Sequence, residues 1–142
     1  MRLFDANVLL YAVNRDAPLH ARARRSLDEA LGGPEAVGFA WVVLLAFLRL
    51  STRPDLFPRP LTPEEAFRTV EAWLGAPAAV VVDPTVRHLA VLRGLVAPLG
   101  TAANLVNDSH LAALAVEHDA TLVSFDRDFG RFPGLRWEEP PD

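Results

Sequence analysis

The sequence lacks cysteine and lysine altogether, and each absence excludes a class of function. Without cysteine the chain has no disulfide, no thiolate zinc site and no cysteine nucleophile. All 14 basic residues are arginine, which excludes a P-loop, a Schiff-base enzyme and a receiver-type phosphoacceptor domain, because each needs a lysine. No apolar run approaches the roughly 20 residues of a membrane span, and Asp5 interrupts the first apolar run at once. We therefore expect a cytoplasmic protein without a signal peptide or a membrane partner.

Length and hydrophobic content predict one domain with an ordinary core. The 142 residues are 51% hydrophobic and include no low-complexity segment. Short apolar runs alternate with helical patterns along the chain, which indicates a parallel sheet with helices on both faces. We therefore expect residues 1–142 to form a single α/β domain, an α/β/α sandwich with a central parallel sheet of four to five strands.

The turn and capping residues of the sequence place the individual elements. The helix expected at 40–51 is apolar nearly all round, so we expect it to be buried. We also expect the apolar strand at 78–82 to be buried. Asp83 closes that strand, and the Pro-Thr that follows favours a helix N-cap over a metal ligand. Strands are expected at 2–4, 36–39, 78–82 and 121–124, with a short edge strand at 135–137, and helices at 6–13, 19–31, 40–51, 63–75 and 85–99 and around Asp108.

Three aspartates fall where a buried carboxylate needs a partner. Asp5 and Asp126 each follow a short apolar strand, and the carboxyl ends of parallel strands meet at one edge of a sheet. Asp108 lies in or near the first turn of a helix, on the apolar face that it shares with Leu111 and Ala115. Converging carboxylates repel one another unless a divalent cation neutralises them, and an all-oxygen ligand set selects Mg²⁺ or Mn²⁺ over zinc.

Several other polar residues have two interpretations. Asp128 is either a further ligand or the cap of a short turn. Arg49, the one charge of its apolar helix, either extends to the surface or pairs with the acids or a phosphate. The arginines of the helix at 19–31 form either a solvated face or a contact for phosphate or a partner. The four histidines show no metal-ligand spacing, and only His110 lies close enough to Asp108 in sequence to support it.

Charge is unevenly distributed along the chain. The net charge of −4 argues against a generic nucleic-acid binder, which would be basic. Residues 1–60 carry eight arginines against six acids, whereas the remainder carries six arginines against twelve acids. Most candidate ligands fall in the acidic part, and the arginines can still form a local phosphate-binding surface around a metal centre.

With these residues identified, the chain resembles the PIN-domain ribonucleases, specifically the VapC toxins of VapBC toxin–antitoxin pairs. The resemblance is spread over the chain and is carried by Phe4–Leu10 (FDANVLL), Trp41–Arg49 (WVVLLAFLR), Asn107–Ala115 (NDSHLAALA), Ala120–Phe129 (ATLVSFDRDF) and Phe132–Leu135 (FPGL). It implies a PIN-like fold and a Mg²⁺-dependent endoribonuclease that acts on RNA. It also implies a VapB-type antitoxin that inhibits the enzyme, and a homodimer.

The resemblance assigns roles to individual residues. By this similarity the catalytic positions are Asp5, Asp108 and Asp126; the metal positions are these three and Asp128; the substrate contacts are Arg49 and Ser124. The expected chemistry is metal-assisted hydrolysis of a phosphodiester bond.

One departure from the family pattern leaves an alternative open. Many PIN nucleases carry a glutamate where this chain has Ala46. Its absence favours one tightly held ion over two, and it also allows a catalytically silent PIN module that binds RNA or a protein partner. A phosphatase with an aspartate nucleophile is a weaker alternative, because Asn7 stands where that chemistry needs a second aspartate.

Overall fold

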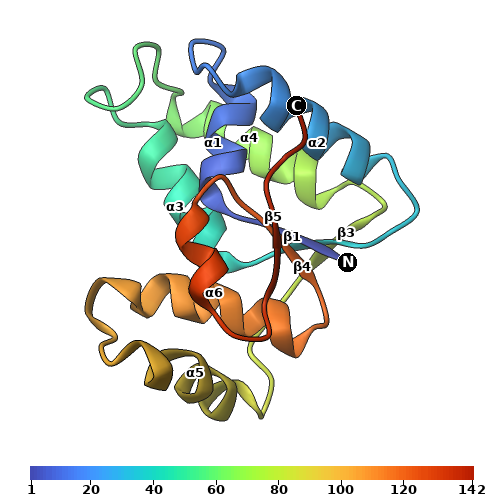
Figure 1. The fold of residues 1–142 in the computed structure, drawn as a ribbon. Helices are drawn as coiled ribbons and strands as arrows, with labels where there is room; N and C mark the ends of the chain where they lie inside the picture. Colours follow the sequence, from blue (N-terminus) through green and yellow to red (C-terminus); the bar gives the residue numbers. More distant parts are fainter.

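The computed structural model describes all residues 1–142 and contains five strands and six α-helices (Figure 1). None of the helices combines the length and apolar character needed to cross a membrane. The strands are β1 (Arg2–Phe4), β2 (Val37–Phe39), β3 (Ala79–Val81), β4 (Thr121–Val123) and β5 (Arg136–Glu138). The helices are α1 (Ala6–Val13), α2 (His20–Leu31), α3 (Trp41–Ser51), α4 (Pro63–Leu74), α5 (His88–Val96) and α6 (Val106–Glu117), with 3-10 turns at Ala97–Leu99, Ala103–Leu105 and Arg127–Arg131.

All five strands form one parallel sheet in the order β3-β2-β1-β4-β5. The central strand is β1, in which Leu3 lies opposite Gly38 of β2 on one side and Leu122 of β4 on the other. The late strand β4 lies beside the first strand β1 in the middle of the sheet, so the residues that follow these two strands lie next to each other. The predicted parallel sheet and its short last strand are confirmed.

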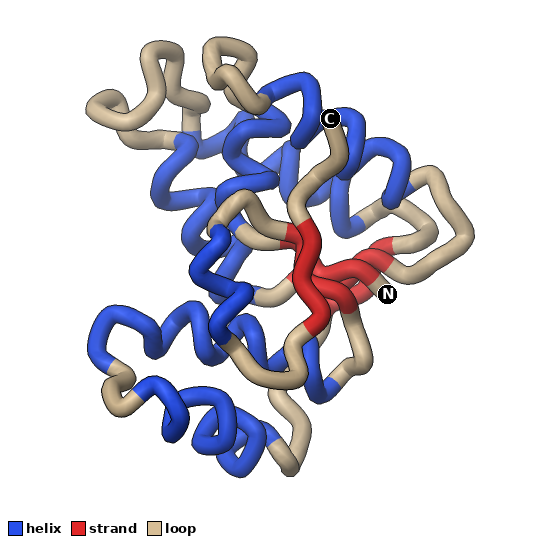
Figure 2. The backbone as a smooth tube through the Cα atoms, viewed as in Figure 1, coloured by secondary structure: helices blue, strands red, loops and turns tan.

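Helices cover both faces of the sheet, as Figures 1 and 2 show. The helices α1 to α4 pack together on one face, and α5 packs with α6 on the other. Phe4, Phe39 and Phe47 are completely buried between the layers. Trp73 of α4 closes the core, with its ring centroid 4.8 Å from Phe47 and 6.2 Å from Phe39. The predicted α/β/α sandwich is confirmed.

The start of α4 follows from its sequence. The Thr62 hydroxyl accepts a hydrogen bond from the Glu65 backbone N–H (3.1 Å), and the Thr62 N–H donates to the Glu65 carboxylate (3.2 Å). This capping box satisfies two N–H groups that have no partner inside the helix, and Pro63 occupies the first helical position, where no N–H is needed. The helix ends at Gly75, as predicted.

Two predictions of burial are wrong. The helix α3 buries only one side: Trp41 and Leu45 are 48% and 59% exposed, and Arg49 continues the same exposed face. The strand β3 lies at the edge of the sheet, where Val80 and Val81 are 38% and 43% exposed. An apolar run shows that an element can be buried, but the topology decides which of its faces meets a partner.

The predicted cap at Asp83 is also wrong. The helix α5 begins at His88, three residues later than expected, and Asp83 is exposed with no hydrogen bond to its carboxylate. No side chain caps α5, and the Thr85 hydroxyl instead stabilises the turn before the helix by accepting a hydrogen bond from the Arg87 N–H at 3.1 Å.

Candidate active site

The site begins where β1 passes into α1. Asp5 follows the last residue of β1, and its N–H donates to the Val123 carbonyl of the neighbouring β4 (3.0 Å). Its extended backbone makes it the N-cap of α1, and its Oδ1 accepts a hydrogen bond from the Ala6 N–H (2.7 Å). The sheet and the helix start therefore fix this carboxylate at the carboxyl edge of the two central strands, as the sequence predicts.

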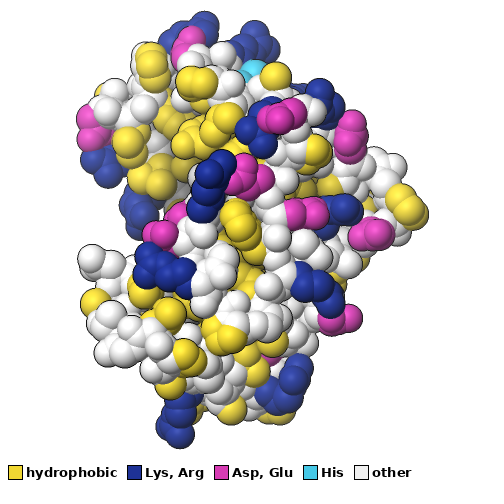
Figure 3. All heavy atoms as spheres, in the orientation of Figure 1, with side chains coloured by type: hydrophobic (Ala, Val, Ile, Leu, Met, Phe, Trp, Pro, Cys, Tyr) yellow, Lys and Arg dark blue, Asp and Glu magenta, His cyan; other side chains and the backbone are white.

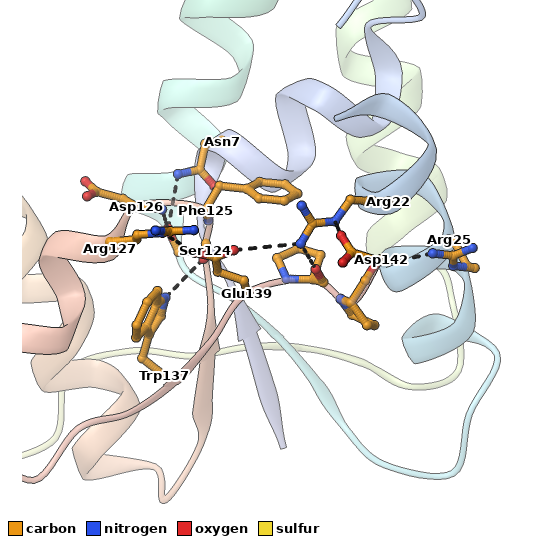
Figure 4. Close-up of polar contacts among 12 residues, drawn as sticks. Asn7, Arg22, Arg25, Ser124, Phe125, Asp126, Arg127, Trp137, Glu139 and Asp142 are labelled. Carbon is orange, nitrogen blue, oxygen red and sulfur yellow. Dashed lines mark hydrogen bonds and ion pairs between the residues drawn. The ribbon is translucent and has the colours of Figure 1, made fainter. Parts of the chain in front are cut away.

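Two polar side chains hold the other oxygen of Asp5. The Ser124 hydroxyl, at the end of β4, donates to Asp5 Oδ2 at 2.7 Å, and Asn7 Nδ2 donates to the same oxygen at 3.1 Å. Asn7 also donates to Ser124 Oγ (3.1 Å) and accepts from the Phe125 N–H (3.2 Å) through Oδ1 (Figure 4). Sequence reasoning missed this role of Asn7, although its place two residues after a strand-end aspartate was a usable signal.

Asp126 lies on the loop that follows β4. Its N–H donates to Ser124 Oγ (3.0 Å), so one buried hydroxyl links the Asp5 and Asp126 segments. Its Oδ1 accepts the Asp128 N–H (2.9 Å), which makes Asp126 the cap of the 3-10 turn at Arg127–Arg131. Asp128 is therefore not that cap, and its carboxylate pairs with Arg131 at 3.1 Å.

Asp108 reaches the site from the opposite layer. It lies in the first turn of α6 and forms no hydrogen bond or ion pair within the protein. Asp108 and Asp5 line the same cleft, of about 280 Å³, together with Arg49 and Ala46 of α3. The structure thus brings two of the predicted catalytic acids to one cleft, with Asp126 held beside them through Ser124.

The electrostatics show that these acids act on one another. Burial raises the pKa of Asp5, hydrogen bonds from Ser124 and the Ala6 N–H oppose the rise, and the charge of Asp126 adds to it. Burial and the charges of Asp5, Asp126 and Asp128 raise the pKa of Asp108 from its ordinary value of 3.8 to about 6, against the opposing charge of Arg131. Four carboxylates therefore share one field, and Arg131 is the cation that opposes it at Asp108.

The carboxylates of the cleft fit an open cation site, of the kind that Mg²⁺ occupies, better than they fit a site closed by protein ligands alone. No three acidic or histidine side chains stand in positions from which they could hold one ion. Mg²⁺ does not require such a cage, because it keeps several waters and is held by one or two carboxylates together with substrate phosphates. Asp5 and Asp108 supply that number of carboxylates, and Asp126 Oδ2 has no partner in the protein.

The two expected substrate contacts lie in different surroundings. Ser124 is completely buried, so we correct its expected role: its hydroxyl holds Asp5 and cannot reach a substrate. Arg49 is exposed at the cleft. Elsewhere on the surface arginine and acidic side chains lie side by side (Figure 3). One such ion pair joins Arg59 to Asp16 at 2.9 Å, whereas Arg49 forms none.

The histidines do not support the carboxylates. His110 Nδ1 lies 2.9 Å from Nε2 of His88, and His88 Nδ1 lies 2.5 Å from the fully buried Glu117 carboxylate. His110 therefore joins α6 to α5, and the suggestion that it supports Asp108 is wrong. Glu117 also accepts hydrogen bonds from the N–H and hydroxyl of Thr85 (2.9 and 2.6 Å). Sequence reasoning missed this buried chain, because its members are spread over two helices.

Comparison with known proteins places this geometry in a family. The sequence model of the PIN domain family matches residues 2–135. Ribonuclease VapC37 of Mycobacterium tuberculosis is 60% identical over 141 residues, which cover 99% of this chain and 98% of that protein. Ribonuclease VapC43 of the same species is 39% identical over 142 residues, or 100% and 97% of the two chains. The crystal structure of VapBC2 from Rickettsia felis bound to a promoter DNA fragment includes a chain with a TM-score of 0.72 and 19% identity, and the likeness covers 97% of each chain.

Proposed function

This chain belongs to the PIN domain family and to its VapC ribonucleases, and on that premise we propose that it cleaves RNA with Mg²⁺ held by Asp5 and Asp108. The observation that carries the proposal is the state of Asp108. This half-buried carboxylate has no partner in the protein, lines a cleft with Asp5 and has a pKa raised to about 6. A divalent cation held by the two carboxylates would offset the repulsion that, after burial, raises the pKa of Asp108.

The residues of the chain divide the work of hydrolysis among them. When bound, Mg²⁺ supplies positive charge to the phosphate and makes water more acidic. Ser124 and Asn7 orient Asp5 by donating to its Oδ2, and the hydrogen bond from Ser124 opposes the rise of the Asp5 pKa. Asp126 orients the attacking water with Oδ2, because its Oδ1 already accepts the Asp128 N–H. Asp128, paired with Arg131, is the outermost acid of the cluster.

Arg49 is the residue that we propose for contact with the RNA backbone. It is exposed, has no ion pair and lines the cleft with Asp5 and Asp108. An unpaired guanidinium at the edge of a metal centre attracts a phosphate and holds it by two parallel hydrogen bonds. This local charge allows a chain of net charge −4 to bind RNA at one place.

The remaining parts of the proposal concern organisation and partners. We propose that residues 1–142 act as one domain, which is supported by the single sheet and the single cluster of 28 buried residues. The enzyme is the toxin of a toxin–antitoxin pair, a VapB-type antitoxin neutralises it, and two copies form a homodimer. Mn²⁺ can take the place of Mg²⁺ as the cofactor, because both ions prefer oxygen ligands.

Ala46 supports one second candidate, a PIN module that binds RNA or a protein without cutting. Its side chain lines the cleft with Asp5 and Asp108, and it supplies no carboxylate there. The experiment that separates the two functions is incubation of purified, antitoxin-free protein with total RNA, with Mg²⁺ and with EDTA. We expect discrete fragments that form only with Mg²⁺. Intact RNA under both conditions, with protein shown to be folded, favours the binding module.

A further inference from the structure

The segment Glu139–Asp142, here called the C-terminal tail, lies along α2 and beside the loop that carries Asp126 (Figure 4). The Arg22 guanidinium of α2 donates to the Pro140 carbonyl from Nη2 at 2.5 Å. Its Nε lies 3.2 Å from Asp142 Oδ1, and its Nη2 lies 3.7 Å from Glu139 Oε2. Three groups of the tail thus surround one guanidinium, which fixes the tail on α2.

Arg22 also contacts the loop directly. Its guanidinium carbon lies 5.3 Å from the centre of the Phe125 ring, and the other neighbour of that ring is Tyr11, at 5.6 Å. The Arg22 side chain is only 26% exposed. It therefore does not belong to a solvated helix face, which was one of the two interpretations of the arginines at 19–31. A partly desolvated guanidinium over an aromatic ring is held more firmly than an exposed one. Phe125 immediately precedes Asp126, so this contact restrains the backbone that carries the Asp126 carboxylate.

The tail and the strand before it also contact this loop directly. Glu139 accepts a hydrogen bond from Arg127 Nε at 2.8 Å and also forms the ion pair with Arg22. It therefore connects the residue after Asp126 to α2. The Trp137 indole N–H, from β5 just before the tail, donates to the Ser124 carbonyl at 3.0 Å. The loop from Ser124 to Arg127 is thus anchored at each of its ends by β5 and the tail.

Trp137 and the tail residues of these contacts lie beyond residue 135, where the match to the family's sequence model ends, whereas Arg22 and the loop lie within it. From these contacts we propose that Arg22 and Glu139 are positioning residues that orient the Asp126 carboxylate for RNA cleavage. The inference rests on the proposed function, because it assigns a purpose to the orientation of Asp126. It does not concern metal binding by Asp5 and Asp108, which the tail does not touch.

The chemistry explains why such a support matters. Asp126 has one oxygen committed to its own turn and one free for water, so a small rotation of the loop changes where the free oxygen points. A displacement of about 1 Å at a reacting group can cost about a hundredfold in rate. A positioning residue therefore affects kcat while the affinity for substrate, set elsewhere in the cleft, stays nearly constant.

The test compares Arg22→Ala with Arg25→Ala. Arg25 is one turn away on α2, donates only to the Pro141 carbonyl (3.3 Å) and touches neither Phe125 nor Glu139, so it is a matched control. For Arg22→Ala we expect kcat to fall about tenfold with KM within about twofold of the parent value. We also expect the backbone amide resonances of residues 124–128 to shift, and we expect neither change in Arg25→Ala.

A second variant and the spectra keep the outcome decisive. Glu139→Gln retains the shape of the side chain but loses its charge, and we expect it to lower kcat by about threefold through the weakened bridge. Equal kcat in Arg22→Ala and Arg25→Ala, or unshifted amides at 124–128, overturns the inference while leaving the proposed function intact. A parent protein that does not cut RNA overturns the proposed function, and the amide shifts still decide whether Arg22 and Glu139 set the position of Asp126.

Discussion

Replacement of Asp108 by asparagine should stabilise the metal-free protein, although it removes a residue to which we assign a role in the reaction. The pKa of Asp108 rises from 3.8 to about 6 because of burial and the charges of Asp5, Asp126 and Asp128. At about 1.36 kcal/mol per pKa unit the ionised form costs about 3 kcal/mol above pH 6. Asp108 is only half-buried, so screening by solvent reduces this to about 1–2 kcal/mol.

The sign of the effect depends on pH. A carboxyl group whose pKa is raised on folding stabilises the folded state while it is protonated, and this contribution is lost as the pH rises from 3.8 to about 6. Asp108→Asn should therefore match the parent protein near pH 4 and exceed it by the full amount at pH 7.5. For a chain of this size, that gain corresponds to an increase of about 3–7 °C in the melting temperature.

The assay is urea unfolding of both proteins in EDTA at pH 4 and pH 7.5, repeated at pH 7.5 with Mg²⁺. Asp83→Asn is the control, because Asp83 is an exposed strand-end aspartate with no hydrogen bond to its side chain. Added Mg²⁺ should stabilise the parent protein, by about 2.7 kcal/mol at a hundred times its dissociation constant, and should stabilise Asp108→Asn far less. An Asp108→Asn protein that is no more stable than the parent at pH 7.5 in EDTA refutes the reasoning.

Two further predictions concern buried polar groups. Ser124→Ala removes the hydroxyl that links Asp5 to Asp126, so it should lose about 1–3 kcal/mol of stability in urea unfolding and about tenfold in kcat. The control is Ser51→Ala, at a buried hydroxyl with no partner, which should lose neither. Equal losses in the two variants would contradict the assignment. Burial alone would raise the pKa of Glu117, but hydrogen bonds from Thr85 and His88 hold it below its ordinary value, so this group stabilises the fold above pH 4.5 and less in acid. Glu117→Gln should accordingly cost about 2–3 kcal/mol at pH 7 and little near pH 3, and a cost that does not depend on pH would contradict this account.

The strand ends and the fold could be predicted from the sequence because they depend on local patterns. Asp5 and Asp126 each follow a short apolar run, and parallel strands bring such positions to one edge whatever their distance along the chain. The capping box of α4 involves residues only three apart, and it appears as predicted.

The errors occur where a distant partner decides the outcome. Whether α3 is buried on both sides depends on what lies against Trp41 and Leu45, and nothing in the helix itself shows that this face has no partner. The exposure of β3 depends on its place at the edge of the sheet. The inward position of Arg22 depends on the last four residues of the chain, which are far away in sequence.

The site shows the same division between local and distant signals. The aspartates could be identified from their own surroundings, and so could Asn7 as a polar neighbour of Asp5, but its hydrogen bond from the Phe125 N–H depends on the distant loop after β4. Ser124 was expected to touch substrate because of its place beside the site, whereas its complete burial shows that it acts through Asp5.

The central claim is that Asp5 and Asp108 together hold the ion on which cleavage depends. Anomalous diffraction from crystals soaked in Mn²⁺ tests it most directly, because it locates the ion without reference to activity. We predict one strong peak in the cleft, at about 2.0–2.2 Å from an oxygen of each carboxylate, and no peak there in crystals of Asp108→Asn. A peak held by other residues, or none at saturating Mn²⁺, would contradict the account.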